Sequence, residues 1–442
     1  MCGCGDRHAP GEPTPYDVGR DALVTGRRTL LKAGGGVAIS TAAVAAASSA
    51  ATAAPTPART RKRVYVLVVD GCLPEEISEE LTPHLYALRE GGRQFAQARS
   101  QPIMETIPNH VMMMTGVRPD RSGVPANAVY DRAAKVVRDL DRATDLKAFT
   151  IIERLNRQGL RTGTVLSKEY LYGVFGTRAT ARWEPFPVLP ITGHAPDEFT
   201  IQAAMAMVED VDPHLMFVNL GDIDRYGHAD VTGSVGAKVA RRLALVKTDG
   251  YVQQFVDRLK ASGAWKNSML IVLADHSMDW STPDRVISLS GPLDEDPVLR
   301  GRVQIADNGG ADLLYWTGPA AGKEDAVERM LRIAQAQNGV LSAHDRRKGL
   351  RLGTNAGDVV VFCRAGWRFS DPDPVTSNPI PGNHGHPATR PIPFFLSGGH
   401  PAVVKRSASA LVASTVDVAP TVARFFGCAT RPKAGYDGTS RI

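Results

Sequence analysis

Short apolar runs alternate with amphipathic stretches along most of the chain. The first run, Val64–Val69, ends at Asp70-Gly71, and the residues behind it predict a helix from Thr82-Pro83 to Gly91-Gly92. A continuous apolar run is typical of a strand buried on both faces, as in a parallel sheet. Similar patterns predict strands over 162–166, 214–220, 269–273 and 393–396, and helices over 149–160, 235–259 and 416–426. Together they predict an α/β fold with a mainly parallel central sheet flanked by helices.

The pattern loosens between Ser277 and Pro381. Residues 279–310 are rich in Pro, Asp, Gly and Ser, 326–337 predicts a helix, and 358–369 (DVVVFCRAGWRF) predicts paired strands. The strand and helix patterns resume after this region. We therefore interpret about residues 279–380 as a cap inserted into a single catalytic domain that spans 63–442.

The N-terminus carries a targeting pattern. Arg27-Arg28 precedes a long Ala-rich apolar run, which ends at Ala51-Thr52-Ala53, an A-x-A cleavage pattern. Residues 1–53 resemble a bacterial twin-arginine export signal, and 54–62 predict a flexible lead-in. An uncleaved membrane anchor is the alternative, since the run approaches spanning length. Its Ala, Gly and Ser content makes it a weak span. We expect cleavage, no stable span afterwards, the twin-arginine machinery as a partner, and a secreted or periplasmic bacterial protein.

Composition narrows the functional classes. The 442 residues are 43% hydrophobic and 22% charged, with a formal net charge of +6, so a large core can be buried and the charge excess is mild. No dense Lys/Arg block with interleaved aromatics is present, which argues against specific nucleic-acid binding. Cleavage would leave Cys72, Cys363 and Cys428, too few for a disulfide framework. A single bridge, such as one between Cys363 and Cys428, remains an open alternative.

Asp and His residues follow several of the predicted strands. Any one of them could be a turn residue or a histidine satisfied by the fold. Ligands of open parallel sheets gather beyond the carboxyl ends of the strands, and carboxylates with imidazoles suit zinc or a similar divalent ion. Their coincidence at several strand ends therefore favours a metal site. The residues are Asp70; Asp222, Asp224 and His228 in GDIDRYGH; Asp275 and His276; and His384 and His386 in PGNHGHP.

A threonine opens a predicted helix in the stretch ETIPNHVMMMTG. Thr106 stands two residues before Pro108, which is a common way to start a helix. A hydroxyl at a helix N-terminus is also well placed to attack an anion held there. This stretch alone is compatible with both interpretations.

The ordered motifs resemble a known family. VVDG, TIPNHVMMMTG, DIDRYGH, ADHSM and GNHGH, followed by VDVAPTVARFFG, resemble the alkaline phosphatase superfamily, and within it the type I phosphodiesterase/nucleotide pyrophosphatase family. That family shows Thr-x-Pro-Asn at the nucleophile, Asp-x-x-Gly-His, Asp-His-Gly-Met and a late His-Gly. The resemblance runs from about residue 64 to 427 and implies an alkaline-phosphatase-like fold.

The resemblance also implies a two-metal site, with zinc as the expected ion. The family spacing selects Asp224 over Asp222, and a ligand that precedes Gly selects His384 over His386. Thr106 would be the nucleophile and form a covalent phospho-intermediate, and the Asn109 amide would donate to a nonbridging phosphate oxygen. One ion would be held by Asp70, Asp275, His276 and the Thr106 oxygen, and the other by Asp224, His228 and His384.

The expected activity is hydrolysis of phosphate esters, with diesters, pyrophosphates or nucleotide-like small molecules as substrates. A phosphomonoesterase and a carbon–phosphorus bond hydrolase of the same superfamily are the alternatives. An exported metal- or phosphate-binding protein without turnover is an alternative of another class, although binding alone would not require the Thr106 hydroxyl. Ser277 stands where the family usually has Gly, Ser122 where His is common, and His386 where Tyr is common, which leaves specificity open.

Overall fold

An eight-stranded mixed sheet forms the centre of the larger part of the molecule. The computed structural model describes residues 61–185, 193–229, 239–428 and 435–442. Five neighbouring strands, in the order β8-β1-β7-β5-β6, run parallel, and β17 joins β8 in the antiparallel direction. The full order is β18 (Ser407–Ser409), β2 (Arg93–Phe95), β17 (Phe394–Ser397), β8 (Ser268–Leu273), β1 (Arg63–Val69), β7 (Leu215–Leu220), β5 (Thr162–Val165) and β6 (Ala181–Trp183).

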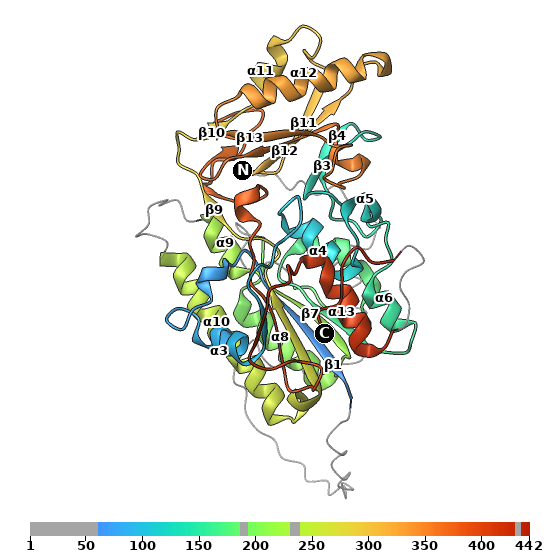
Figure 1. Ribbon diagram of the computed structural model, residues 1–442, viewed down its shortest axis with the longest axis vertical. Coiled ribbons are helices and arrows are strands. Elements are labelled where there is room, and N and C mark those ends of the chain that lie inside the picture. The colour runs from blue at the N-terminus through green and yellow to red at the C-terminus, as the bar shows by residue number, and fades with distance from the viewer. Residues whose placement is uncertain (1–60, 186–192, 230–238, 429–434) are drawn as a thin grey trace, which may run out of the picture.

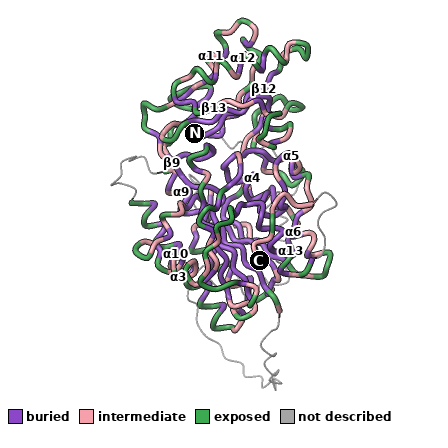
Figure 2. The backbone as a smooth tube through the Cα atoms, viewed as in Figure 1, coloured by how far each residue is buried: buried purple, intermediate pink, exposed green. Residues whose placement is uncertain are grey.

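Helices cover both faces of this sheet (Figure 1). One group packs around α10 (Val239–Ala261) and comprises α3 (Pro83–Gly91), α8 (Asp197–Asp210) and α9 (Asp222–Ala229). The other group comprises α4 (Thr106–Thr115), α5 (Pro119–Ser122), α6 (Ile151–Asn156), α7 (Glu169–Phe175) and α13 (Val418–Phe426). Every residue of β1, β7 and β8 is buried, as expected of strands covered on both sides (Figure 2).

A second sheet lies within the region where the sequence predicts a cap. It is antiparallel, in the order β11 (Val303–Asp307), β12 (Ala311–Trp316), β14 (Val359–Cys363) and β13 (Val340–Asp345). It packs with α11 (Ser290–Glu295) and α12 (Lys323–Ala336) around a hydrophobic cluster separate from the main core. Figure 1 shows this part above the large sheet. Smaller pairs are β3 (Ala128–Asp131) with β4 (Val136–Asp139), β9 (Asp279–Trp280) with β16 (Gly382–Asn383), and β10 (Val286–Ile287) with β15 (Arg368–Phe369).

The predicted fold class is confirmed, with local corrections. The two strands predicted within 358–369 do form, as β14 and β15, but they pair with other strands and not with each other. The helix predicted over 149–160 is shorter and ends at Asn156. Cys363 and Cys428 are both free thiols and form no bridge; the Cys363 thiol contacts the Trp367 carbonyl, and the Cys428 thiol contacts Gln158.

Some predictions fall outside the described residues. The export signal over 1–53 and most of the lead-in over 54–62 lie there, as do the first residues of the helix predicted from 235. Within the described ranges, none of the helices has the length and apolar character needed to span a bilayer.

Candidate functional site

The candidate site lies at one edge of the large sheet, where the parallel strands end. β1 leads into Asp70, β7 into α9 with Asp224, and β8 into Asp275-His276. Because β17 runs antiparallel to β8, its N-terminal end approaches the same edge, and the segment before it brings His384 there. The strand directions therefore explain why side chains so far apart in sequence meet.

The close approach of the end of β1 to the start of α9 depends on Gly71. Gly71, directly after Asp70, has φ +71°, and a Cβ at this position would lie 3.0 Å from Cβ of Asp224. The left-handed backbone and the short distance both disfavour any larger residue. Gly71 thus lets the end of β1 lie against the start of α9.

Two groups of ligand-type atoms lie close enough to hold ions. Within each group the ligand atoms lie within 4.8 Å of one another, and His276 belongs to both. These residues are all buried, and several of their polar atoms have no hydrogen-bond partner in the described structure. Unpaired buried carboxylate oxygens are costly unless a cation or donor meets them. The residues therefore fit divalent ions. The groups are Asp70, Asp275 and His276, and Asp224, His276 and His384; the atoms without a hydrogen bond include Asp224 Oδ1, Asp275 Oδ2 and His384 Nδ1.

Two histidines are held with a lone pair facing the site. His276 Nδ1 lies 2.9 Å from the Ser277 carbonyl oxygen, and His228 Nδ1 lies 2.8 Å from the Gly382 carbonyl oxygen. A carbonyl only accepts, so each Nδ1 carries the proton and each Nε2 is unprotonated in the neutral ring, as a metal ligand requires. His228 Nε2 lies 3.4 Å from Asp224 Oδ1 and 3.1 Å from His384 Nε2. His228 thus stands beside the second group.

Burial keeps the His276 and His384 rings neutral. Desolvation lowers the pKa of His276 to about 4, despite the opposing pull of Asp224 and Asp70. Desolvation, with His276 and His228 nearby, holds the pKa of His384 well below its usual range. Neutral imidazoles at neutral pH are the form that binds a metal ion.

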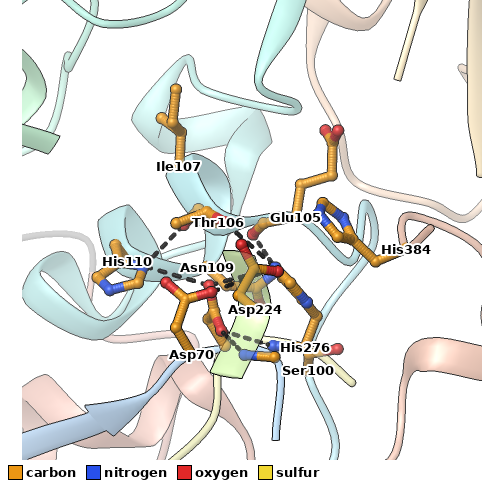
Figure 3. Close-up of polar contacts among 12 residues, drawn as sticks. Asp70, Ser100, Glu105, Thr106, Ile107, Asn109, His110, Asp224, His276 and His384 are labelled. Carbon is orange, nitrogen blue, oxygen red and sulfur yellow. Dashed lines mark hydrogen bonds and ion pairs between the residues drawn. The ribbon is translucent and has the colours of Figure 1, made fainter. Parts of the chain in front are cut away.

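Thr106 begins α4 and faces this cluster. Its Oγ1 lies 3.2 Å from His276 Nε2, and Figure 3 shows it above Asp70, Asp224 and His276. Its own carbonyl lies 2.8 Å from His110 Nδ1, whose other nitrogen lies 3.2 Å from the Asn219 amide. That amide also donates to Asp70 Oδ2 at 2.8 Å. A chain of hydrogen bonds therefore ties the first turn of α4 to the end of β1.

The predicted role of Asn109 needs correction. Its amide nitrogen lies within 3.2 Å of the carbonyl oxygens of Gln101, Ile103 and Glu105, and its Oδ1 accepts from Gln101 N and Thr415 Oγ1. The side chain is fully buried and already satisfied, so it stabilises the loop before α4 and has no donor left for a substrate.

Asn127 is a donor that the sequence reasoning missed. Its Oδ1 accepts from the Ile107 amide at 2.9 Å, in the first turn of α4 next to Thr106. Across the described ranges its own NH2 group makes no hydrogen bond to protein. Asn127 directly precedes β3 and carries no local motif, so only the tertiary fold reveals it.

The sequence reasoning also missed Lys168, although the rule that ligands gather beyond the carboxyl ends of parallel strands would have pointed to it. It lies just beyond β5, is fully buried, and its Nζ lies 2.8 Å from Asp70 Oδ1 and 2.7 Å from Asp224 Oδ2. Burial opposes its charge, but Asp224 and Asp70 outweigh this and raise the Lys168 pKa. Burial likewise opposes ionisation of Asp224, but Lys168 and then His228 hold the pKa of this carboxyl well below its usual range. Burial and the neighbouring Asp275 raise the pKa of Asp70.

Asp222 and His386, the two residues that the family spacing did not select as metal ligands, make other contacts. Asp222 Oδ1 lies 2.9 Å from His194 Nε2, and the Asp222 amide donates to Asp197. His386 Nε2 lies 2.9 Å from Asp279 Oδ2. Asp224 and His384 are the members of these pairs that join the buried ligand groups.

A two-lobed α/β fold with carboxylates, histidines and a threonine at the ends of its parallel strands defines a metal-site protein of the alkaline phosphatase superfamily. The chain belongs to the type I phosphodiesterase/nucleotide pyrophosphatase family, whose model matches residues 64–387. It is therefore a member of a family of metal-dependent phosphoric ester hydrolases, as the sequence motifs predicted.

Known relatives match most of the chain. It is 25% identical over 401 residues to a bis(5'-adenosyl)-triphosphatase of Bos taurus, covering 86% of this chain and 81% of that protein. It is 23% identical over 391 residues to human ectonucleotide pyrophosphatase/phosphodiesterase family member 5, covering 85% and 76%. Among solved structures, murine ectonucleotide pyrophosphatase/phosphodiesterase 5, an inactive threonine-to-alanine variant in complex with AMP, superposes with a TM-score of 0.69 at 18% identity, covering 83% and 95%.

Proposed function

We propose that the protein is an exported two-metal hydrolase that cleaves phosphodiesters or nucleotide pyrophosphates through a phosphothreonine intermediate on Thr106. The observation that carries this is the Thr106 hydroxyl at a helix N-terminus, directly beside two adjoining groups of buried carboxylate and imidazole ligands. A site that only bound metal would not need a hydroxyl at that point.

Each proposed ion has its own set of ligand residues. One ion would be held by Asp70, Asp275, His276 and the Thr106 oxygen, and the other by Asp224, His228 and His384. Bound divalent ions, with zinc suited to this ligand set, would lower the pKa of the Thr106 hydroxyl and offset charge on the phosphoryl oxygens.

The chemistry would then proceed in two displacements. Thr106 Oγ forms a bond to phosphorus while the ester P–O bond breaks, and the leaving oxygen takes up a proton. Water then cleaves the Thr106–phosphorus bond and restores the hydroxyl. The free NH2 of Asn127 and the N-terminus of α4 would stabilise the nonbridging oxygens, in place of Asn109.

Substrate class is inferred from charge and from relatives. The nucleophile motif contains no Arg, and a neutral amide donor suits the single charge of a diester. The relatives are named as pyrophosphatases and phosphodiesterases, and one of them was solved with AMP. A phosphomonoesterase or a carbon–phosphorus bond hydrolase is the second candidate, since Lys168 adds a cation that the motif alone does not reveal.

Matched p-nitrophenyl substrates test this proposal. We expect kcat/KM to be higher for bis(p-nitrophenyl) phosphate than for p-nitrophenyl phosphate, with activity lost in EDTA and restored by zinc. A monoester preference of tenfold or more, about 1.4 kcal/mol in transition-state stabilisation, would reverse the substrate assignment. Undiminished hydrolysis after exhaustive chelation would contradict the metal-dependent mechanism.

Export is the remaining part of the proposal. Arg27-Arg28, the Ala-rich run and the A-x-A pattern support a twin-arginine signal over 1–53 and a secreted or periplasmic protein.

A further inference from the structure

Lys168 stands between the two ligand groups. Its Nζ contacts Asp70 Oδ1, a member of one group, at 2.8 Å and Asp224 Oδ2, a member of the other, at 2.7 Å. The side chain is fully buried, and a lysine is rarely buried unless it is paired. The ammonium therefore touches the carboxylates on which both candidate ions depend.

The surrounding backbone fixes this position. Lys168 follows β5 and immediately precedes α7, its carbonyl accepts from the Leu171 amide, and an antiparallel bridge joins its backbone to His194. The neighbouring Ser167 hydroxyl donates to Asn219, which in turn donates to Asp70. The lysine is thus anchored by main-chain bonds and does not depend on the carboxylates alone for its place.

The carboxylates need a positive partner whether or not an ion is present. Asp70, Asp224 and Asp275 are each almost completely buried, and like charges at such short range repel strongly in a poorly solvated site. A bound divalent ion would supply that charge, but a chain that folds before it acquires metal has to find it internally. The Lys168 ammonium is placed to do so.

We propose that Lys168 is a positioning residue that serves as an internal counter-ion: it holds the ligand carboxylates together in the metal-free protein, and it competes with bound ions for them. This inference rests on the proposed metal centre. Two consequences follow. Removing the ammonium destabilises the metal-free protein, and it strengthens ion binding, because a cation that shares the same carboxylate oxygens no longer repels the ion.

Zinc-binding isotherms on the full chain test both consequences, using a chromophoric chelator as competitor and thermal unfolding as a second readout. For Lys168→Met we expect a lower unfolding temperature without metal, at least about tenfold tighter zinc binding, and a zinc-induced rise in unfolding temperature that exceeds the wild-type rise by roughly 5 °C. Lys168→Gln, which keeps a polar side chain of similar length, should show the same directions if the methionine variant does not fold. Lys168→Arg, which keeps the charge, should remain closer to wild type.

Arg63→Met is the matched control. Arg63 is another fully buried cation, paired with Asp212 at 2.6 Å, but at the opposite end of β1 from Asp70. This variant should lose stability equally with and without zinc and bind zinc as the wild type does. Equal or weaker zinc binding by both Lys168→Met and Lys168→Gln would overturn the counter-ion role while leaving the metal centre standing. A wild-type protein that binds no zinc would instead refute the metal centre, and the counter-ion role with it.

Discussion

At the scale of single residues, hydrogen bonds outside the candidate site decide which atoms face it. The carbonyls of Ser277 and Gly382 fix the protons of His276 and His228 on Nδ1 and leave both Nε2 atoms free to bind an ion. Motif spacing identifies these histidines, but it says nothing about tautomers. Those depend on carbonyl groups that the folded chain brings beside them.

Thr106→Ala should abolish turnover while the fold is kept. We expect kcat to fall about 10⁴-fold or more, because the nucleophile itself is lost. Thr115→Ala is the control on the same helix, since that hydroxyl donates to the Val111 carbonyl away from the ligand cluster. Steady-state hydrolysis of bis(p-nitrophenyl) phosphate, with circular dichroism as a check on folding, measures the difference. Near-wild-type rates for Thr106→Ala would show that the covalent mechanism is wrong.

Substitution of Asn109 should mainly lower stability, whereas substitution of Asn127 should mainly lower kcat. Asn109→Ala removes a buried side chain with five hydrogen-bond contacts, and it should lower the free energy of unfolding by about 2 kcal/mol or more. Asn127→Ala should lower kcat by about 10²-fold with a smaller loss of stability. Denaturant unfolding and kinetics on the same two proteins check both effects. The reverse pattern would restore the role first predicted for Asn109.

At the scale of elements, the rule that ligands gather beyond the carboxyl ends of parallel strands predicted most of the site residues and missed two of them. Asp70, Asp224, Asp275 and His276 follow strands whose apolar runs are plain in the sequence. Lys168 follows β5, a short strand with two threonines and a glycine, so the apolar pattern that marks the other strand ends is weak there. Asn127 lies near the site because it is hydrogen-bonded to Glu105 and Ile107 on either side of Thr106, which is a tertiary effect that no local pattern encodes.

Arg241 of α10 links two of the loops that carry ligands. It is buried, donates to the carbonyls of Gly71 and Ile223, and pairs with Glu76. Those carbonyls flank Asp70 and Asp224. Arg241→Lys keeps the charge but loses the guanidinium fork, so we expect zinc binding to weaken by about tenfold. Competition titration measures this, and unchanged affinity would limit Arg241 to a structural role.

Asp312 of β12 should make the stability of the cap depend on pH. It is fully buried, and no donor of the described structure reaches its carboxylate oxygens; the neighbouring Asp371 carboxylate can only accept a hydrogen bond from it when Asp312 is protonated. Burial, with Asp307 and Asp371 nearby, raises its pKa well above the usual range. The folded state therefore retains this proton to higher pH than the unfolded state, and stability is lost as the pH rises above about 4.

Asp312→Asn should remove that loss. We expect its unfolding temperature to exceed the wild-type value by about 3 °C at pH 8, with a much smaller gain at pH 5. Asp325→Asn, at an exposed position on α12, is the control and should show no such pH-dependent gain. Differential scanning calorimetry at the two pH values checks this. An equal gain at both would contradict the assignment of the effect to a buried charge.

At the scale of the whole molecule, the chain folds around two separate hydrophobic clusters, one at the large sheet and one in the second sheet with α11 and α12. The sequence predicted the larger unit well, because its strands are uniformly apolar and in regular alternation with helices. It predicted the smaller unit as an inserted cap with one helix and a pair of strands, and it did not predict β11, β12 or β13. The antiparallel pairing there depends on strands distant in sequence, such as β12 with β14.

Export of the whole chain should depend on the Arg27-Arg28 pair. Replacing Arg27 and Arg28 together by lysine should retain the precursor in the cytoplasm, because the twin-arginine route depends on this pair. Fractionation of bacterial cells, followed by detection of precursor and mature protein, measures the effect. Unchanged secretion of the double variant would assign the protein to the general secretory route.

The whole proposal depends on two ions acting with Thr106, so the number of bound ions at which activity appears is the decisive quantity. Zinc should be added stepwise to the metal-free protein, with the ions bound per chain and the rate of bis(p-nitrophenyl) phosphate hydrolysis measured on the same samples. We predict binding of about two ions per chain, with most of the activity appearing as the second ion binds. Full activity with a single ion, or with none, would contradict the two-metal mechanism.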